Sequence, residues 1–191
     1  MLSETERSNS LLWEIKSYVN DSKLRRDCLL HDGGQCVVTK WFDKGWLEKK
    51  FSGQTMPQGC LSTLACVHII PFSRKKPDER KPMDLRTNAK IWWPLWRYFP
   101  DLKGKIGPDT INQTGNAFTM QAIVHGDFGD FEFGFEQQHG SFCARNPAIG
   151  LFKNHPEVVK FASVDLGVAE LPDPVFLDVH HRVGDILIIS H

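Results

Sequence analysis

The sequence predicts an α+β fold, with helices and short strands in a single domain of 191 residues. Apolar residues recur at helical spacing over residues 10–20 and again over 173–190, which predicts a helix near each end of the chain. Between them, phenylalanines alternate with other residues over 131–136, the pattern of a half-buried strand. The length and the hydrophobic content of 41% suffice for one substantial core.

The first elements follow from caps and turns. Ser10 is placed to cap a helix over 10–20, because its hydroxyl can accept a hydrogen bond from the first helical turn. Residues 25–31 are expected to end a second helix, which an Asp-Gly-Gly turn at 32–34 joins to a short strand over 36–39. This part of the chain therefore predicts a helix, a helix end and a strand.

The middle of the chain is less regular. Residues 40–60 show no repeating pattern, and a second strand is expected over 61–70, where Pro71 stops it. The polar segment 73–90 predicts a surface loop. The dense aromatic cluster at 91–100 is interpreted as core packed at helical spacing, in preference to a platform on which nucleic-acid bases stack.

The second half of the chain offers clearer signals. Residues 118–120 suit a short strand, and 122–128 suit a short helix that ends at Gly129, where glycine tolerates a left-handed cap. Asp173 is expected to cap the last helix and Pro174 to start it. The apolar stripe of this last helix consists of Val175, Val179, Val183, Ile186 and Leu187.

Charge and cysteine content argue against several classes of protein. Lys and Arg together number 23, as do Asp and Glu, and a net charge of zero is unusual for a protein dedicated to long DNA. The five cysteines include no Cys-x-x-Cys pair, so a disulfide framework and a four-cysteine zinc site are not expected. The sequence has neither a long apolar run nor a secretory signal, which predicts an intracellular protein, in cytoplasm or nucleus, without a membrane partner.

One segment departs from this neutral balance. Positive charge gathers just after position 68, where a solvated loop and a contact for nucleic-acid phosphates are both possible interpretations. The residues of this basic run are Arg74, Lys75, Lys76, Arg80 and Lys81.

Two histidines and an asparagine are the candidates for chemistry. His68 ends an apolar strand, and Asn116 stands nine positions before His125. Histidine is the side chain best suited to act as a base near neutral pH and is also the commonest metal ligand. A hairpin packed on a helix could bring both imidazoles to one cleft. By contrast, His31 stands at a turn and is expected to face solvent.

These residues carry a resemblance that spans about residues 25–190. The matching stretches are Arg26-Asp27, Asp32 to Thr39, His68-Ile69-Ile70-Pro71-Phe72-Ser73, Ile111-Asn112, Asn116 to Met120, His125, Phe128 to Glu132, and Leu171 to Pro174 with His180. In their order and in the spacing of Asn116 and His125, the chain resembles the HNH endonuclease family, and more specifically the HNH-nuclease-domain proteins common in fungi. The resemblance implies a ββα-metal core over about 26–136, with flanking helices, an added β-hairpin or strand and a C-terminal helix.

The resemblance also implies a reaction, the metal-dependent hydrolysis of DNA phosphodiester bonds. His68 would be the general base that activates water, Asn116 would tie the loop to the helix and orient His68, and His125 would ligate one divalent ion. Mg²⁺ or Mn²⁺ would be the ion, and Zn²⁺ is conceivable. Asp127 and Asp130 could add metal ligands, and the basic run could contact the DNA backbone.

The sequence departs from the family pattern in two places. The residue before the base, often a second metal ligand in the family, is Val67, and Ala65 stands where relatives often carry glutamate. The alternative hypothesis is therefore an HNH-like fold whose degenerate metal site serves small-molecule catalysis, as an isomerase or cyclase in fungal secondary metabolism, or a binding module. The sequence does not predict an oligomeric state.

Overall fold

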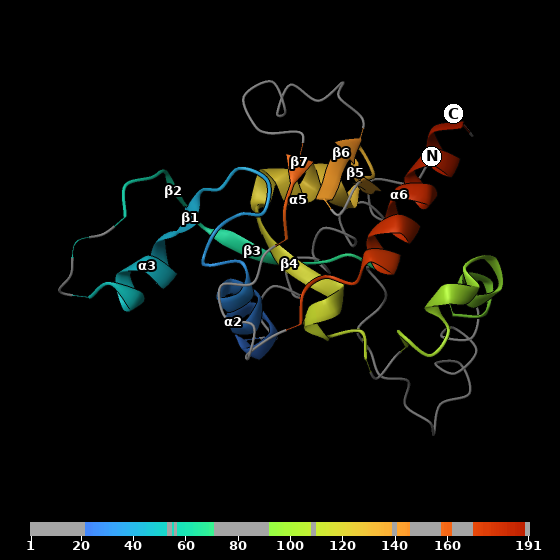
Figure 1. Cartoon of the computed structure of the whole chain (residues 1–191), viewed down its shortest axis with the longest axis horizontal. Helices are drawn as coiled ribbons and strands as arrows, with labels where there is room; N and C mark the ends of the chain where they lie inside the picture. The colour runs from blue at the N-terminus through green and yellow to red at the C-terminus, as the bar shows by residue number, and fades with distance from the viewer. Residues whose placement is uncertain are drawn as a thin grey trace, which may run out of the picture.

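The fold is known for most of the chain beyond residue 21. A computed structural model (Figure 1) describes residues 22–52, 55, 57–70, 92–107, 110–138, 141–145, 158–161 and 170–189. The expected helix over 10–20, the loop over 73–90 and the basic run within that loop lie outside the described residues.

The described residues form a mixture of helices and short strands, in agreement with the predicted α+β class. The helices are α2 (Ser22–His31), α3 (Lys44–Lys50), α5 (Ala122–Gly129) and α6 (Pro174–Ile189), with 3-10 turns η1 (Pro100–Leu102) and η2 (Thr114–Asn116). Residues 92–98 are also helical. The strands are β1 (Phe42–Asp43), β2 (Leu61–Ser62), β3 (Leu64–His68), β4 (Ala117–Gln121), β5 (Gly134–Gln138), β6 (Ser141–Arg145) and β7 (Val158–Val159). No helix among these described stretches is both long and apolar enough to cross a bilayer.

An antiparallel pair of strands, β3 and β4, lies at the centre of the fold. It is called the hairpin below, although a long segment, 69–116, connects its two strands. The register pairs Leu64 with Gln121 at one end and His68 with Ala117 at the other. Directly paired residues share a face of a sheet, and successive residues alternate between faces. The hairpin therefore has two faces of different composition. One, called the α2 face, carries Leu64, Cys66, His68, Ala117, Thr119 and Gln121, and the other, called the α5 face, carries Ala65, Val67, Phe118 and Met120.

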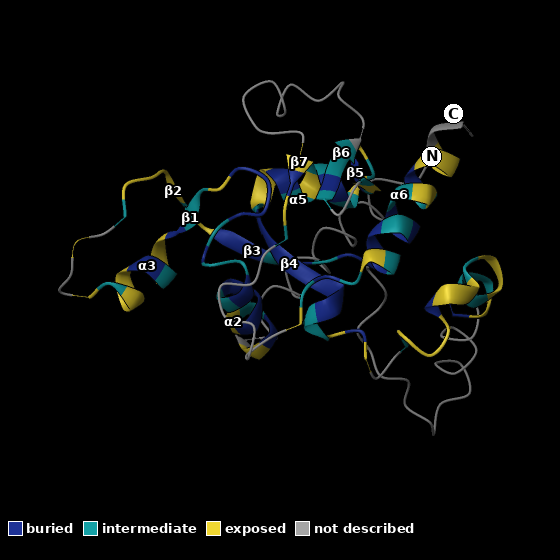
Figure 2. Cartoon of the chain, viewed as in Figure 1, coloured by how far each residue is buried: buried dark blue, intermediate teal, exposed yellow. Residues whose placement is uncertain are grey.

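A different helix covers each face, and Figure 1 shows α2 and α5 on opposite sides of the hairpin. On the α2 face, the Cys66 Sγ lies 3.5 Å from the Cys28 Sγ of α2. On the α5 face, the Phe118 ring meets the Phe128 ring of α5 edge-on, with centroids 5.4 Å apart. The strands are buried along most of their length as a result (Figure 2).

A second sheet and the last helix complete the core. Strands β5, β6 and β7 pair antiparallel in that order, and α6 packs on β5. Gly134 permits this close packing, because a Cβ at that position would lie 3.0 Å from the His181 Cα. The Phe135 ring of β5 reaches the Phe118 ring of the hairpin, with centroids 6.0 Å apart, so both sheets share one hydrophobic core.

Two expectations for the region around residue 40 are wrong. Residues 37–39 form a turn in place of a strand, because the chain contacts β4 only locally there, where Val37 N–H donates to the Thr119 carbonyl over 3.0 Å. The second wrong expectation is that residues 40–60 are irregular, because helix α3 lies within this segment. Its start is set by Asp43, whose Oδ1 accepts a hydrogen bond of 2.9 Å from the Trp46 N–H.

The turn after α5 also differs from expectation. Helix α5 ends at Gly129 as predicted, but the left-handed residue in this turn is Phe131, with a φ of 59°. The strand accordingly begins only at Gly134, and Phe131 lies before it. Phe131 is stacked on the His180 ring with centroids 4.6 Å apart, so packing accounts for this unusual backbone conformation.

The last helix and the aromatic cluster are predicted only in part. The cap is confirmed, since the Asp173 Oδ1 accepts a hydrogen bond of 2.8 Å from the Val175 N–H. The predicted stripe is wrong at its end, because Ile186 is 60% exposed and Leu187 41% exposed. In the aromatic cluster Trp92 is buried, whereas Trp93 is 67% and Tyr98 77% exposed, so only one side of that helix belongs to the core.

Candidate active site

His68 lies at the end of β3, half-buried on the α2 face of the hairpin. Its Nε2 is 2.9 Å from the Oδ1 of Asn112. A carboxamide oxygen only accepts hydrogen bonds, so Nε2 carries the proton and Nδ1 is the basic nitrogen of the ring. This hydrogen bond fixes the orientation of the imidazole, and histidine is the side chain best suited to act as a base near neutral pH.

Asn116 is fully buried and bonds to the chain on both sides of the loop that follows His68. Its Oδ1 accepts from the Ile70 N–H over 2.9 Å, and its Nδ2 donates to the carbonyls of Ile70 at 3.3 Å and Ile111 at 3.0 Å. Its own carbonyl accepts from the Ile69 N–H over 2.9 Å. Asn116 thus fixes the backbone next to His68. The side chain that bonds to the His68 ring is Asn112, whose Oδ1 accepts the hydrogen bond.

Asn112 is the residue whose role the sequence does not indicate. It forms part of the matching stretches, but no residue type or spacing marks it as a partner of His68, which is 44 positions away. The one available signal is the pair of amides at 112 and 116, of which the first precedes η2 and the second is its last residue. The tertiary fold turns one amide toward the backbone and the other toward the imidazole.

His125 lies on α5 and is half-buried. Burial lowers the pKa of His125, although the nearby charge of Asp130 acts in the opposite direction. The ring is therefore neutral at neutral pH, the form in which imidazole binds metals. Asp130 follows the end of the helix and is exposed, and Asp127 lies within it and is half-buried.

Strand pairing does not place His68 and His125 on the same face of the hairpin. His68 belongs to the α2 face, whereas α5 packs on the opposite face through Phe118 and Phe128. The residue that points toward α5 at this end of β3 is Val67, which is 1% exposed. The convergence of the two imidazoles thus stays a prediction that requires the His68 ring to reach around the strand end.

The donor set determines what kind of metal ion the described residues could hold. Within the described part of the chain, no three His, Cys, Asp or Glu side chains lie together as a group that could hold a metal. A neutral His125 beside the negative charge of Asp130 could still supply one ligand, with water and substrate oxygens completing the coordination. Among the described residues, His125 and Asp130 are thus an incomplete donor set, which water and substrate oxygens would have to complete.

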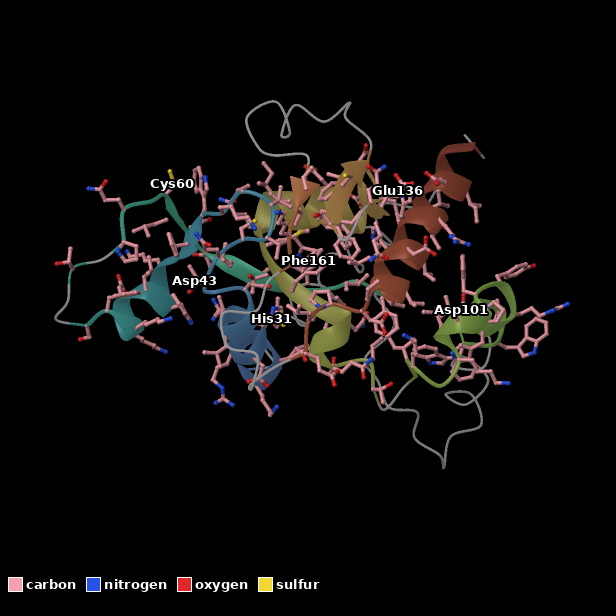
Figure 3. The ribbon with its side chains drawn as sticks, viewed as in Figure 1. His31, Asp43, Cys60, Asp101, Glu136 and Phe161 are labelled. Carbon is pink, nitrogen blue, oxygen red and sulfur yellow. The ribbon has the colours of Figure 1, made fainter. Side chains whose placement is uncertain are left out.

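The α2 face also carries a buried polar network, close to His31 in Figure 3. His31 is fully buried, contrary to expectation, and its Nδ1 lies 2.6 Å from the Asp32 Oδ1. The Thr119 N–H and hydroxyl both donate to the Asp32 Oδ2, over 2.7 and 2.8 Å. Burial raises the pKa of Asp32, and the hydrogen bonds from His31 and Thr119 partly offset this effect. The network joins the turn after α2 to the middle of β4, so its role is structural.

Comparison with known proteins identifies the family of the chain. The HNH endonuclease family matches residues 36–136, which span β1 to β5 and include His68, Asn112, Asn116 and His125. No curated protein and no solved structure matches the chain. The family suggests a nuclease-type hydrolase that acts on DNA and uses a divalent metal. The match covers more than half of the chain, which therefore belongs to the HNH endonuclease family.

Proposed function

We propose that the chain is a metal-dependent endonuclease that hydrolyses DNA phosphodiester bonds, with His68 as the general base. The observation that carries this proposal is the hydrogen bond of 2.9 Å between the His68 Nε2 and the Asn112 Oδ1, at a strand end inside the region that matches the family. It orients the ring and leaves Nδ1 as the basic atom. We also propose that β3, β4 and α5 form the ββα core of the family, since they follow that order.

In the proposed reaction, the His68 Nδ1 removes a proton from a water molecule while the water oxygen attacks phosphorus in line with the leaving 3′ oxygen. The imidazolium that results is stabilised by its Nε2–H···O hydrogen bond to Asn112, because hydrogen bonds from charged donors are stronger than neutral ones. Asn116 holds Ile69 and Ile70, so the ring approaches the phosphate from a fixed backbone. The proton acceptor and its support thus come from three residues of this chain.

His125 would hold the divalent ion, with Asp127 and Asp130 as further candidates for ligands. A bound divalent ion would supply positive charge to the phosphate oxygens and the leaving oxygen. Mg²⁺ and Mn²⁺ suit a site completed by water and phosphate oxygens, and Zn²⁺ suits the imidazole nitrogen. Because the described residues provide few ligands, we expect weak affinity and a requirement for added ion.

The test is a plasmid-nicking assay with wild-type protein, His68→Ala and the matched control His181→Ala, with Mg²⁺, Mn²⁺, Zn²⁺ or EDTA. Removal of a general base typically costs about 10²- to 10⁴-fold in rate. We expect that loss in His68→Ala and not in the control, with unchanged thermal unfolding in both. Nicking by His68→Ala at the wild-type rate would refute the proposal.

A second candidate function is catalysis on a small molecule, as an isomerase or cyclase, or ligand binding without catalysis. It is favoured by Val67, which is buried where many relatives carry a metal ligand, and by the missing group of three ligands among the described residues. Under this alternative the wild-type protein would nick no plasmid with any of the three ions.

A further inference from the structure

A second feature of the surface lies away from His68, between α2 and α3. A cavity of about 640 Å³ opens there, and Thr63, the residue before β3, is part of its lining. The charged side chains that line it are the cations Arg25, Arg26, Lys44 and Lys49 and the carboxylates Asp43 and Glu48. Trp46 adds an aromatic wall to the same cavity, which is called the α2–α3 groove below.

Most of the cations on α2 and α3 are exposed, whereas two carboxylates, one on α2 and one at the N-cap of α3, are buried. The exposed cations on α2 and α3 are Lys23, Arg26, Lys44, Lys49 and Lys50. Glu48 is the one exposed carboxylate on these two helices, since Asp27 is buried, as is Asp43 at the N-cap of α3. A chain with no net charge therefore presents a locally cationic surface at this groove.

Of the two arginines in this groove, Arg25 is held in place by buried groups. The Arg25 Nη2 donates to the Asp43 Oδ2 over 2.7 Å and to the Leu64 carbonyl over 3.3 Å. Asp43, which is labelled in Figure 3, is 2% exposed, and its oxygens also accept from the N–H groups of Trp46 and Leu64. The carboxylate is thus enclosed, whereas 39% of the Arg25 side chain stays exposed in a fixed orientation. Asp43 also lines the groove, but Arg25, Trp46 and Leu64 occupy its oxygens, so the exposed guanidinium is the group that an anion can contact.

We propose that the α2–α3 groove binds the phosphate backbone of the DNA substrate, independently of base sequence. The proposal rests on the proposed endonuclease function, and it places substrate contacts outside the basic run after His68. β3 connects the two sites, because Arg25 bonds to its first residue and His68 is its last. Four residues of strand span about 13 Å, close to the ~12 Å width of the major groove of B-DNA. A duplex held in the groove can thus present another phosphate near His68.

The test compares two pairs of charge reversals that alter the net charge equally. Lys44→Glu/Lys49→Glu changes the groove, and Lys103→Glu/Lys160→Glu changes two exposed lysines elsewhere. Both pairs are made in the His68→Ala background, and binding of a fluorescent 20-base-pair duplex is measured between 50 and 200 mM salt. Each lost phosphate contact lowers the slope of log K against log salt by about 0.9. We expect the groove substitutions to make this negative slope shallower by about 1.8 and to lower affinity tenfold or more. The control substitutions should change affinity less than threefold.

Three results separate the possible outcomes. Equal weakening of duplex binding by both pairs of substitutions would overturn the groove proposal, because net charge alone would then explain binding. Displacement of the duplex by polyglutamate as effectively as by unlabelled duplex would also overturn it, in favour of an acidic protein partner. If the wild type nicks no plasmid while the groove pair still weakens binding selectively, the endonuclease proposal fails and the groove remains a DNA-binding site.

Discussion

The two faces of the β3–β4 hairpin come from alternate residues of the same strands, yet they differ in kind. The α5 face carries Val67 and Phe118 and packs on the aromatic rings of α5 and β5. The α2 face carries His68, Cys66 and Thr119 and meets a cysteine and a carboxylate from α2 and its turn. Because apolar packing on the α5 face supports the core, the α2 face is available for polar groups. We infer that the two faces contribute separately to stability and to activity. We therefore expect substitutions on the α5 face to act on stability and those near His68 to act on activity.

The largest effect is expected from Phe118→Ala, which removes the ring shared by Phe128, Phe135 and Phe161. Truncation of a buried phenylalanine typically lowers the free energy of unfolding by about 3–5 kcal/mol. Urea denaturation would measure the loss. A change below about 1 kcal/mol would mean that the α5 face does not carry the core.

His180 is a buried titratable group that packs on an aromatic ring of α5, and it provides a pH test. Its ring stacks on Phe128 at 3.8 Å, and burial lowers its pKa to about 4. The unfolded chain binds this proton near pH 6.5, so stability should fall as the pH drops from about 6.5 to 4, by at most on the order of 3 kcal/mol. Urea denaturation across that range should show a smaller decrease for His180→Phe than for wild type. Equal pH dependence in the two proteins would contradict the assignment.

On the α2 face, Thr119→Val tests the buried polar network. The hydroxyl donates toward the Asp32 Oδ2 and lies 2.7 Å from the Gln35 carbonyl, and valine can replace neither contact. Unpaired buried polar groups cost about 1–3 kcal/mol, so the free energy of unfolding should decrease by that amount. Nicking at a temperature where the variant is folded should stay near the wild-type rate, and a hundredfold loss would show that the network serves catalysis.

The smallest effect on stability is expected from Asn112→Ala, because Asn112 is exposed and surface changes usually stay within about 0.5 kcal/mol. Its loss should still reduce nicking about 10- to 100-fold, since the His68 ring would lose the acceptor that orients it. Asn112→Asp should recover part of the rate with an altered pH profile, because a carboxylate favours the imidazolium. Unchanged nicking by Asn112→Ala would leave the hydrogen bond without a function.

The sequence predicts the elements whose signals are local. The short helix from Ala122 and the Asp173 cap of the last helix follow from periodicity and capping residues. The strand that carries His68 is predicted only in part, because the expected strand over 61–70 is divided into β2 and β3, which belong to different sheets. Helix α3 is missed because its seven residues depend on the Asp43 cap, and that carboxylate is itself held by Arg25 from α2. Contacts between distant segments have no local signal.

The candidate site shows the same limit. His68, Asn116 and His125 can be selected from residue type, order and spacing, and the family match includes all three. The partner of the His68 ring, the burial of His31 and the separation of the hairpin faces depend on how the chain folds back on itself. Sequence reasoning thus selects candidate groups, and the tertiary structure shows which side chains and backbone groups neighbour them.

The proposed role of the His68 imidazole can be tested by chemical rescue. His68→Gly should nick supercoiled plasmid about 10²- to 10⁴-fold more slowly than wild type. Added imidazole should restore the rate in proportion to its concentration, whereas His181→Gly should show neither loss nor rescue. Wild-type nicking by His68→Gly without imidazole would contradict the assignment of His68 as the base.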